Sequence, residues 1–236
     1  MGDSPLVWAA RNGHEAVVEL LLGRADIDPN KLGEDGHTPL LLAAGNGHEG
    51  VVKLLLGRDD VNPDELAEGG QTALMWAACG GYEGIVKMFL GRDDVNPDQP
   101  DEDGETPLGW AAWSGHEGVV KVLLDQSDID PDRPSEVGQT PLMLAASSGR
   151  EKVVKILLGR DDVNPDSSDN RGQTALSCAA ENGHVGVVEI LLGRNDVNPN
   201  KPDKHGQTPL WYALRGDHAR VVALLQPPTV ATHSTV

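Results

Sequence analysis

The chain has few basic residues, few aromatic residues and no long apolar run. Its 236 residues include 19 lysines and arginines against 37 aspartates and glutamates, which gives a formal net charge of −18. Because nucleic-acid binding needs a basic surface, we expect no nucleic-acid partner. No stretch approaches the roughly 18 consecutive apolar residues of a membrane helix, and no charged-then-apolar signal peptide opens the chain. We therefore expect no membrane partner and a cytoplasmic location.

Motifs for catalysis and cofactor binding are also missing. The sequence holds no G-x-x-x-x-G-K-[ST] phosphate loop and no G-x-G-x-x-G after a strand. No serine or cysteine recurs beside a plausible base. We expect neither an enzyme nor a cofactor, and the class of enzymes and metal proteins is the weakest of the functional alternatives.

The chain is built from copies of one sequence of 34 residues. The segment LGRDDVNPD is identical at 56–64, 90–98 and 158–166. A hydroxyl residue opens each copy at a constant interval of 34: Ser4, Thr38, Thr72, Thr106, Thr140, Thr174 and Thr208. Such a period predicts a single elongated repeat domain over 1–226 instead of separate globular domains.

Each copy encodes two short helices and a loop. In the second copy Thr38 is a good N-cap and Pro39 suits the first helical position. Gly47 can end this helix in a left-handed conformation. An apolar second helix begins at about His48 and ends at Gly57, and a polar segment follows it. Because neither helix is long enough to be stable alone, the copies must stack on one another.

The segment TPLLLAAGNGHEGVVKLLL, followed by DVNP, resembles an ankyrin repeat. The resemblance covers about 4–226 and implies an all-α ankyrin-repeat solenoid, a monomer with seven helix-turn-helix repeats and projecting β-hairpin-like loops. The spelling GRDDVNPD resembles in particular the ankyrin arrays of fungal proteins. Those arrays often follow a NACHT-type domain in NLR-like receptors of innate immunity or incompatibility.

Two departures from the family pattern stand out. The loop from Asn62 to Thr72 is longer than the usual ankyrin hairpin, so longer projecting loops are expected. The family's histidine after TPL is absent from every copy, so the local hydrogen bonding must differ. The residues at that place are Val7, Leu41, Met75, Gly109, Met143, Ser177 and Trp211.

The ends and some individual copies are irregular. The array begins abruptly after Asp3, which suggests a fragment of a longer protein. Asp125 replaces the glycine that ends the second helix of the fourth copy, so that end is expected to fray or to use a different cap. The seventh copy is degenerate around Asp217, and the tail at 227–236 is expected to be disordered.

Five of the eight histidines share one repeat position: His14, His48, His116, His184 and His218. Zinc ligands must converge to about 2 Å from one ion, whereas stacked repeats lie about 10 Å apart. Tyr82 and Arg150 also occupy this place in two copies. We therefore predict capping or inter-repeat hydrogen bonds and no metal. Cys79 and Cys178 lie three repeats apart, beyond disulfide reach, and are predicted to be free thiols.

The first helix of each copy carries the variation expected of a binding face. A helical wheel places its variable positions in solvent, Leu42 and Cys178 among them. In ankyrin arrays this face lines the concave groove that holds partners. All five tryptophans lie on first helices. The candidate ligand-binding residues are Trp8, Arg11, Met75, Trp76, Trp110, Trp113, Met143, Leu144, Glu181, Trp211, Tyr212 and Arg215. The alternative is that the rings lie flat and fill gaps between repeats.

The sequence allows alternatives for the role of the acidic turns and for the setting of the array. The acidic residues of the turns form either a solvated edge or a surface for a basic partner or cation. The array is either the ligand-sensing part of a fungal NLR-like receptor, with a protein or peptide in its groove, or a free-standing scaffold or adaptor. A consensus-like designed array is a third origin, although the irregular seventh copy argues against it.

Overall fold

The computed structural model describes residues 3–226 and contains fourteen α-helices in that range, with no strand. The predicted disordered tail at 227–236 lies outside the described residues. The first helices of the seven repeats are α1 (Pro5–Arg11), α3 (Pro39–Gly45), α5 (Ala73–Gly80), α7 (Pro107–Ser114), α9 (Pro141–Ser147), α11 (Ala175–Glu181) and α13 (Pro209–Arg215). The second helices are α2 (Glu15–Leu22), α4 (Glu49–Leu56), α6 (Glu83–Leu90), α8 (Glu117–Leu124), α10 (Glu151–Leu157), α12 (Val185–Leu192) and α14 (Ala219–Leu225).

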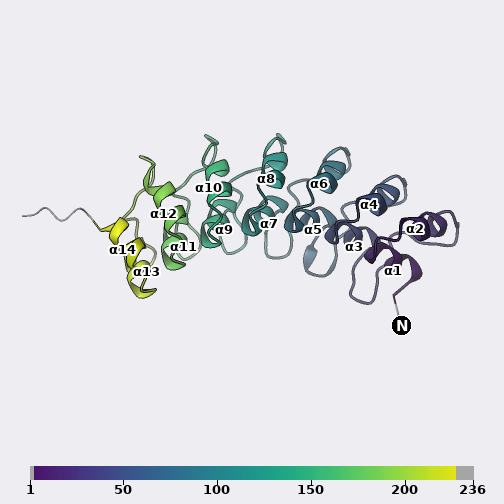
Figure 1. Ribbon diagram of the computed structural model, residues 1–236, viewed down its shortest axis with the longest axis horizontal. Coiled ribbons are helices and arrows are strands. Elements are labelled where there is room, and N and C mark those ends of the chain that lie inside the picture. The colour runs from purple at the N-terminus through teal and green to yellow at the C-terminus, as the bar shows by residue number, and fades with distance from the viewer. Residues whose placement is uncertain (1–2, 227–236) are drawn as a thin grey trace, which may run out of the picture.

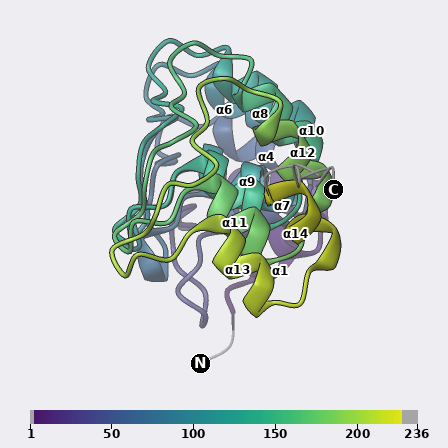
Figure 2. The same ribbon diagram turned by 90° about the vertical axis from the view of Figure 1, so that its left-hand side faces the viewer.

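The helix pairs stack side by side into a curved array with two rows of helices, as the repeat pattern predicts. In Figure 1 the first helices follow the inner side of the arc and the second helices follow the outer side. Figure 2 looks along the array and shows the connecting loops gathered beside the helix layers. No helix within the described range is long and apolar enough to span a bilayer.

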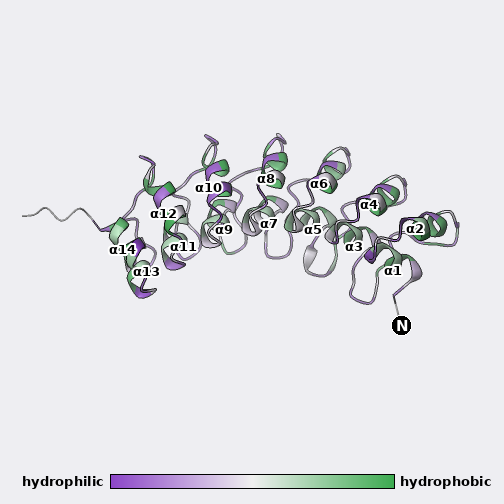
Figure 3. Cartoon of the chain, viewed as in Figure 1, coloured by the Kyte–Doolittle hydropathy of each residue, from purple (hydrophilic) through white to green (hydrophobic). Residues whose placement is uncertain are grey.

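The core runs along the array between the two rows of helices. Paired alanines such as Ala111 and Ala112 have no exposed surface, and their small size lets neighbouring first helices approach closely. In the second helices the buried surface comes from β-branched and leucine side chains, for example Val120 and Leu123. Figure 3 shows the apolar residues on the helices and hydrophilic residues at the loop tips. Each repeat therefore buries its apolar faces between its own two helices and against the adjacent repeats.

The start and end of the first helix follow the sequence prediction. The hydroxyl of Thr38 accepts a hydrogen bond from the backbone N–H of Leu41, and Pro39 is the first helical residue. Gly47 has a φ of +75° and turns the chain into the second helix. In the seventh repeat Asp217 occupies this place with a φ of +55°. An aspartate tolerates the left-handed region better than most residues, which lets the degenerate repeat keep the turn.

The expectation that Asp125 changes the end of α8 is wrong. Asp125 has a φ of −76° and a ψ of −10°. The corresponding Gly57 and Gly91 also have negative φ, near the same values. Glycine is thus not required at this place for its left-handed freedom, and aspartate ends the helix in the same conformation.

The histidine row joins successive repeats by hydrogen bonds, as the sequence predicts. The Nε2 atom of His116 lies 2.8 Å from the carbonyl oxygen of Cys79, near the end of the preceding first helix. His48, His184 and His218 make the equivalent contacts with Arg11, Ser147 and Glu181. Arg150 substitutes for histidine by donating from Nε to the carbonyl of Trp113 over 3.0 Å. These bonds satisfy carbonyl groups that a helix end leaves without an intrahelical partner.

The arginine of the GRDD motif makes a second inter-repeat link, which the sequence did not predict. Arg92 donates from Nε and Nη2 to Asp94 at 2.8 and 2.7 Å, and from Nη1 to the carbonyl of Leu56 in the preceding repeat. The guanidinium lowers the pKa of the Asp94 carboxyl through this hydrogen bonding. Arg58, Arg160 and Arg194 repeat the arrangement.

Candidate functional site

The loop before each first helix is a short projecting finger. In the fourth repeat the N–H of Asp101 donates to the carbonyl of Glu105 and closes the finger, as the hairpin-like loops of the prediction require. The Asp101 side chain also accepts from the backbone N–H groups of Asp103 and Glu105. These bonds hold the finger closed, and the indole N–H of Trp110 ties it to the helix in the repeat where the family's histidine is absent. Adjacent fingers join edge to edge, because the N–H of Glu136 donates to the carbonyl of Asp103 over 2.9 Å.

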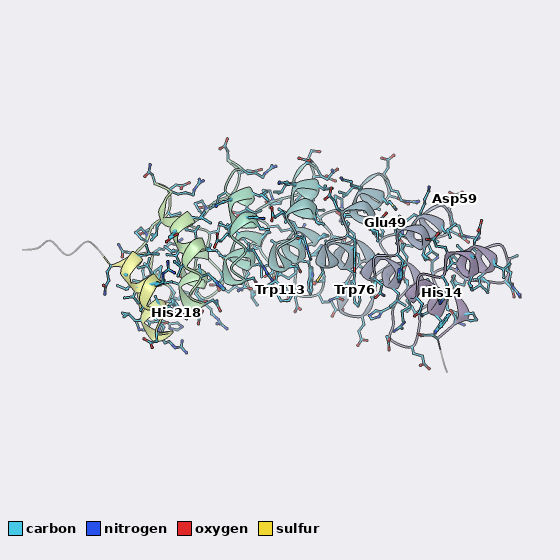
Figure 4. The ribbon with its side chains drawn as sticks, viewed as in Figure 1. His14, Glu49, Asp59, Trp76, Trp113 and His218 are labelled. Carbon is cyan, nitrogen blue, oxygen red and sulfur yellow. The ribbon has the colours of Figure 1, made fainter. Side chains whose placement is uncertain are left out.

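Five predicted binding residues are exposed on the first-helix row, and four others are half-buried. The exposed ones are Trp8, Trp113, Glu181, Trp211 and Arg215. The half-buried ones are Arg11, Trp76, Trp110 and Leu144. Figure 4 places Trp76 and Trp113 on the same side of the array, away from Glu49 and Asp59.

Three candidates are buried, and their predicted availability to a partner is wrong. Met75 and Met143 are 1% exposed and Tyr212 is 6% exposed. Leu42 and Cys178, expected in solvent, are also buried. A helical wheel treats a helix as isolated, whereas the first helices here pack side by side, with α3 to α11 between two others and α1 and α13 beside one. These flanking positions therefore pack against neighbours instead of facing the groove.

Trp76 packs between repeats two and three, as the alternative interpretation of the tryptophans predicts, whereas Trp110 is held by its own finger. Trp76 lies over Gly45 so closely that a Cβ there would approach its ring to 2.5 Å. Its indole N–H donates to Gln71 over 2.8 Å. The indole N–H of Trp110 donates to Asp101 over 3.0 Å, so this residue of the finger fixes the ring. Both rings are anchored and only partly available.

Trp113 is different, because its side chain stands out from the packed layer. It is 49% exposed. Its ring meets Trp110 edge to face, with centroids 6.2 Å apart and an interplanar angle of 84°. A large exposed ring held by an aromatic neighbour is typical of a binding hot spot.

The Trp110–Trp113 pair borders a cavity of about 410 Å³ between repeats four and five, which we name the central pocket. Its lining residues are Asp103, Glu105, Gly109, Trp110, Trp113, Glu136, Val137 and Leu144. A smaller cavity of about 270 Å³ lies one repeat away, beside Trp76 and Met75. The fingers and first helices of repeats four and five thus form the central pocket near the middle of the array.

Glu105 gives the central pocket an unusual carboxyl group. Its pKa is raised from 4.5 to about 7, chiefly by burial and also by the nearby Asp101 and Asp103, against an opposing hydrogen bond with Ser135. The carboxyl lies against α7, where a Cβ on Gly109 would come within 2.8 Å of Oε2. The glycine that replaces the family's histidine in this repeat therefore makes room for Glu105.

The raised pKa of Glu105 predicts a pH-dependent stability. Between about pH 4.5 and about pH 7 the folded chain holds a proton that the unfolded chain has released, so rising pH lowers the free energy of unfolding across this window. Glu105→Gln removes this loss of stability with rising pH. The stability of the variant relative to the original chain should increase by about 2 kcal/mol from about pH 5 to about pH 8, in urea unfolding.

Glu117→Gln is the matched control for this experiment. Glu117 lies on α8 and makes a surface ion pair with Lys152 over 3.0 Å, with the Lys152 side chain 76% and the Glu117 side chain 38% exposed. Its substitution replaces the same carboxyl group by an amide outside the pocket. An equal pH response of the two variants would contradict the assignment to Glu105.

The candidates near the two ends do not join the central pocket. Arg11 pairs with Asp3 and Asp35 at 3.0 Å each, beside the first repeat. At the other end Arg215 lies over the Trp211 ring, 5.5 Å from its centroid. The twelve candidates therefore do not form one site, and the central pair borders the larger of the two cavities described above.

The comparisons with known proteins agree with the repeat geometry. A family model described as ankyrin repeats in three copies matches 6–101, 60–135, 94–169 and 161–232. The chain belongs to the ankyrin repeat family. It is similar to the crystal structure of the ankyrin repeat domain of Bcl-3, described as a unique member of the IkappaB protein family. The two share 25% identity and a TM-score of 0.78, over 96% of this chain and 99% of that chain. A comparison with curated proteins finds no match.

Family membership gives the first-helix row a general role, because ankyrin repeats serve as protein–protein interaction modules.

Among the described residues no group of three or more histidines, cysteines, aspartates or glutamates could hold a metal ion. Cys79 and Cys178 are free thiols. Burial raises the pKa of Cys178 to about 12.

The sequence prediction missed the finger side of the ankyrin groove. Asp103, Glu105 and Glu136 line the central pocket, yet they read in the sequence as ordinary acidic turn residues. The signal available was the position of Glu105, directly before the N-cap Thr106 and near the variable first helix. The side-by-side placement of fingers from consecutive repeats is what brings Glu136 to the same recess.

Proposed function

We propose that the chain is a protein- or peptide-binding module that holds its ligand against the first helices, centred on Trp110 and Trp113. The observation that supports this most is the exposed Trp113 ring beside the central pocket. Apolar surface left in water costs free energy, about 25 cal/mol per Å², that a covering ligand recovers. The second helix of the same repeat, α8, carries no exposed large apolar side chain, and its exposed Lys121 is charged.

The test begins with a ligand selected for this surface. A phage library of random peptides is selected on the immobilised 236-residue chain, and the affinity of an enriched peptide is measured by titration calorimetry. Trp113→Ala should weaken binding by about 30-fold, which corresponds to a hot spot of about 2 kcal/mol. Lys121→Ala, in the same repeat, should leave the affinity unchanged. Failure to enrich any peptide that depends on Trp113 would refute the proposal.

For the biological setting, the proposal is the ligand-sensing array of a fungal NLR-like receptor of innate immunity. Its support is the resemblance of the GRDDVNPD spelling and the variation along the first helices. The alternative, a free-standing scaffold or adaptor, uses the same binding face. The complete coding sequence separates them: an upstream G-x-x-x-x-G-K-[ST] motif supports the receptor, and a complete reading frame without one supports the adaptor.

A further inference from the structure

The central pocket has two aromatic walls set nearly at right angles. Trp110 is held by its hydrogen bond to Asp101, and Trp113 stands against it at 84°. Leu144 of α9 and the exposed Val137 of the next finger extend the apolar lining. The faces of indole rings carry negative electrostatic potential, so such walls suit an apolar stem that ends in a cation.

The remaining lining groups are carboxylates without a cationic partner. Among the residues described, 3–226, no lysine, arginine or histidine forms an ion pair with Asp103, Glu105 or Glu136. The loops after the second helices differ, because each GRDD arginine there binds an aspartate of its own motif, as in the 2.7 Å Arg92–Asp94 pair. With a formal net charge of −18, the chain leaves its finger carboxylates open to a basic ligand.

We propose that the central pocket binds the side chain of an arginine within a basic peptide. This inference rests on the proposed function and specifies the ligand of the same site. The guanidinium stacks on the tryptophan faces and donates to carboxylates in a planar fork. Lysine offers a compact ammonium without that plane, and a trimethylated lysine has no N–H to donate. The combination of two indole walls and several carboxylate acceptors therefore favours arginine.

Glu105 has the position of the principal acceptor. It faces Asp101 and Asp103 in its own finger, Ser135 and Glu136 in the next finger, Trp110 on α7 and Leu144 on α9, and none of these groups is cationic. A guanidinium placed beside it favours the ionised carboxylate. Arginine binding therefore releases a proton from Glu105 near neutral pH, and the affinity rises with pH through about 7.

The test uses small probes on the full-length chain. N-acetyl-arginine-N-methylamide is titrated into protein labelled with ¹⁵N at tryptophan, and the five indole N–H signals are followed after assignment by Trp→Phe variants. N-acetyl-citrulline-N-methylamide is the neutral control of nearly the same shape. We expect saturable shifts at Trp113 and Trp110 with arginine, an affinity about tenfold higher than with citrulline, and no shift at Trp8.

Two variants locate the effect. Glu105→Gln should lower the arginine affinity by about tenfold, leave the citrulline affinity unchanged and abolish the pH dependence. Glu117→Gln makes the same replacement of a carboxyl group by an amide on α8 and should alter neither affinity. Equal affinities for arginine and citrulline, an equal effect of the two variants, or the absence of a shift at Trp113 would each overturn the proposal.

The selected peptides separate this inference from the proposed function. If a peptide needs Trp113 but tolerates replacement of each arginine by citrulline, the binding face stands and the arginine pocket is wrong. If no peptide depends on Trp113 while the arginine probe still saturates the pocket, the pocket stands and the extended binding face is wrong. Tighter binding of a trimethyl-lysine peptide than of the arginine peptide would also reject the guanidinium.

Discussion

Leu108→Ala is expected to destabilise the array by about 3 kcal/mol, whereas Trp113→Ala, in the same helix, is expected to cost less than about 1 kcal/mol. Leu108 has no exposed surface and packs in the core between the rows of helices. Removing its side chain leaves a cavity that the close neighbouring repeats cannot fill. Trp113 is half exposed, so its removal loses mainly the edge-to-face contact with Trp110.

Thermal and urea unfolding, followed by circular dichroism, measure this difference. The same two variants also separate folding from binding, because Trp113→Ala should lower peptide affinity without an early melt. If the two variants melt equally early, Trp113 is a core residue and the binding role assigned to it is wrong.

Gly81→Ala is expected to destabilise the chain by roughly 3 kcal/mol for two separate reasons. Gly81 has a φ of +76°, in the left-handed region that alanine avoids. A Cβ at this place would also collide with the ring of His116 from the next repeat. That ring cannot move away without losing its 2.8 Å contact with the carbonyl of Cys79. The substitution therefore disrupts both the turn within repeat three and its link to repeat four.

Gly91→Ala, one helix further along, provides the matched control. Gly91 has a φ of −79°, and its added Cβ would meet its nearest neighbour, the Lys87 carbonyl, at an ordinary 3.4 Å. We expect this variant to be as stable as the original chain or more stable by up to about 1 kcal/mol, because alanine restricts the unfolded chain. Equal losses for the two alanine variants in urea unfolding would contradict the account of the turn.

The features that depend on one repeat were predictable from the sequence. The cap at Thr38, the left-handed turn at Gly47 and the two helices of each copy are local consequences of residue type, and the period of 34 shows that they recur. The link from His116 to the preceding repeat was also predictable. Histidines at one repeat position lie too far apart to bind one metal ion, which leaves a hydrogen bond between repeats as their role.

The binding face depends on contacts between repeats, and the sequence predicted it only in part. Met75 and Met143 lie beside the exposed positions on a helical wheel, yet adjacent first helices cover them. Glu105 and Glu136 are 31 residues apart and meet only because the fingers stack edge to edge. No periodicity within one repeat carries that information. At Asp125 the sequence suggested a difference that the structure does not show. Glycine ends the second helix at this position in other repeats, but aspartate ends α8 in the same conformation.

Hydrogen exchange with and without a selected peptide tests most directly which face of the array binds. We expect slower amide exchange on binding in the fingers and first helices of repeats four and five, over 101–115 and 135–148, with little change in α8 and α10. The central claim would be contradicted if the protection appeared on α8 and α10 and spared α7 and α9.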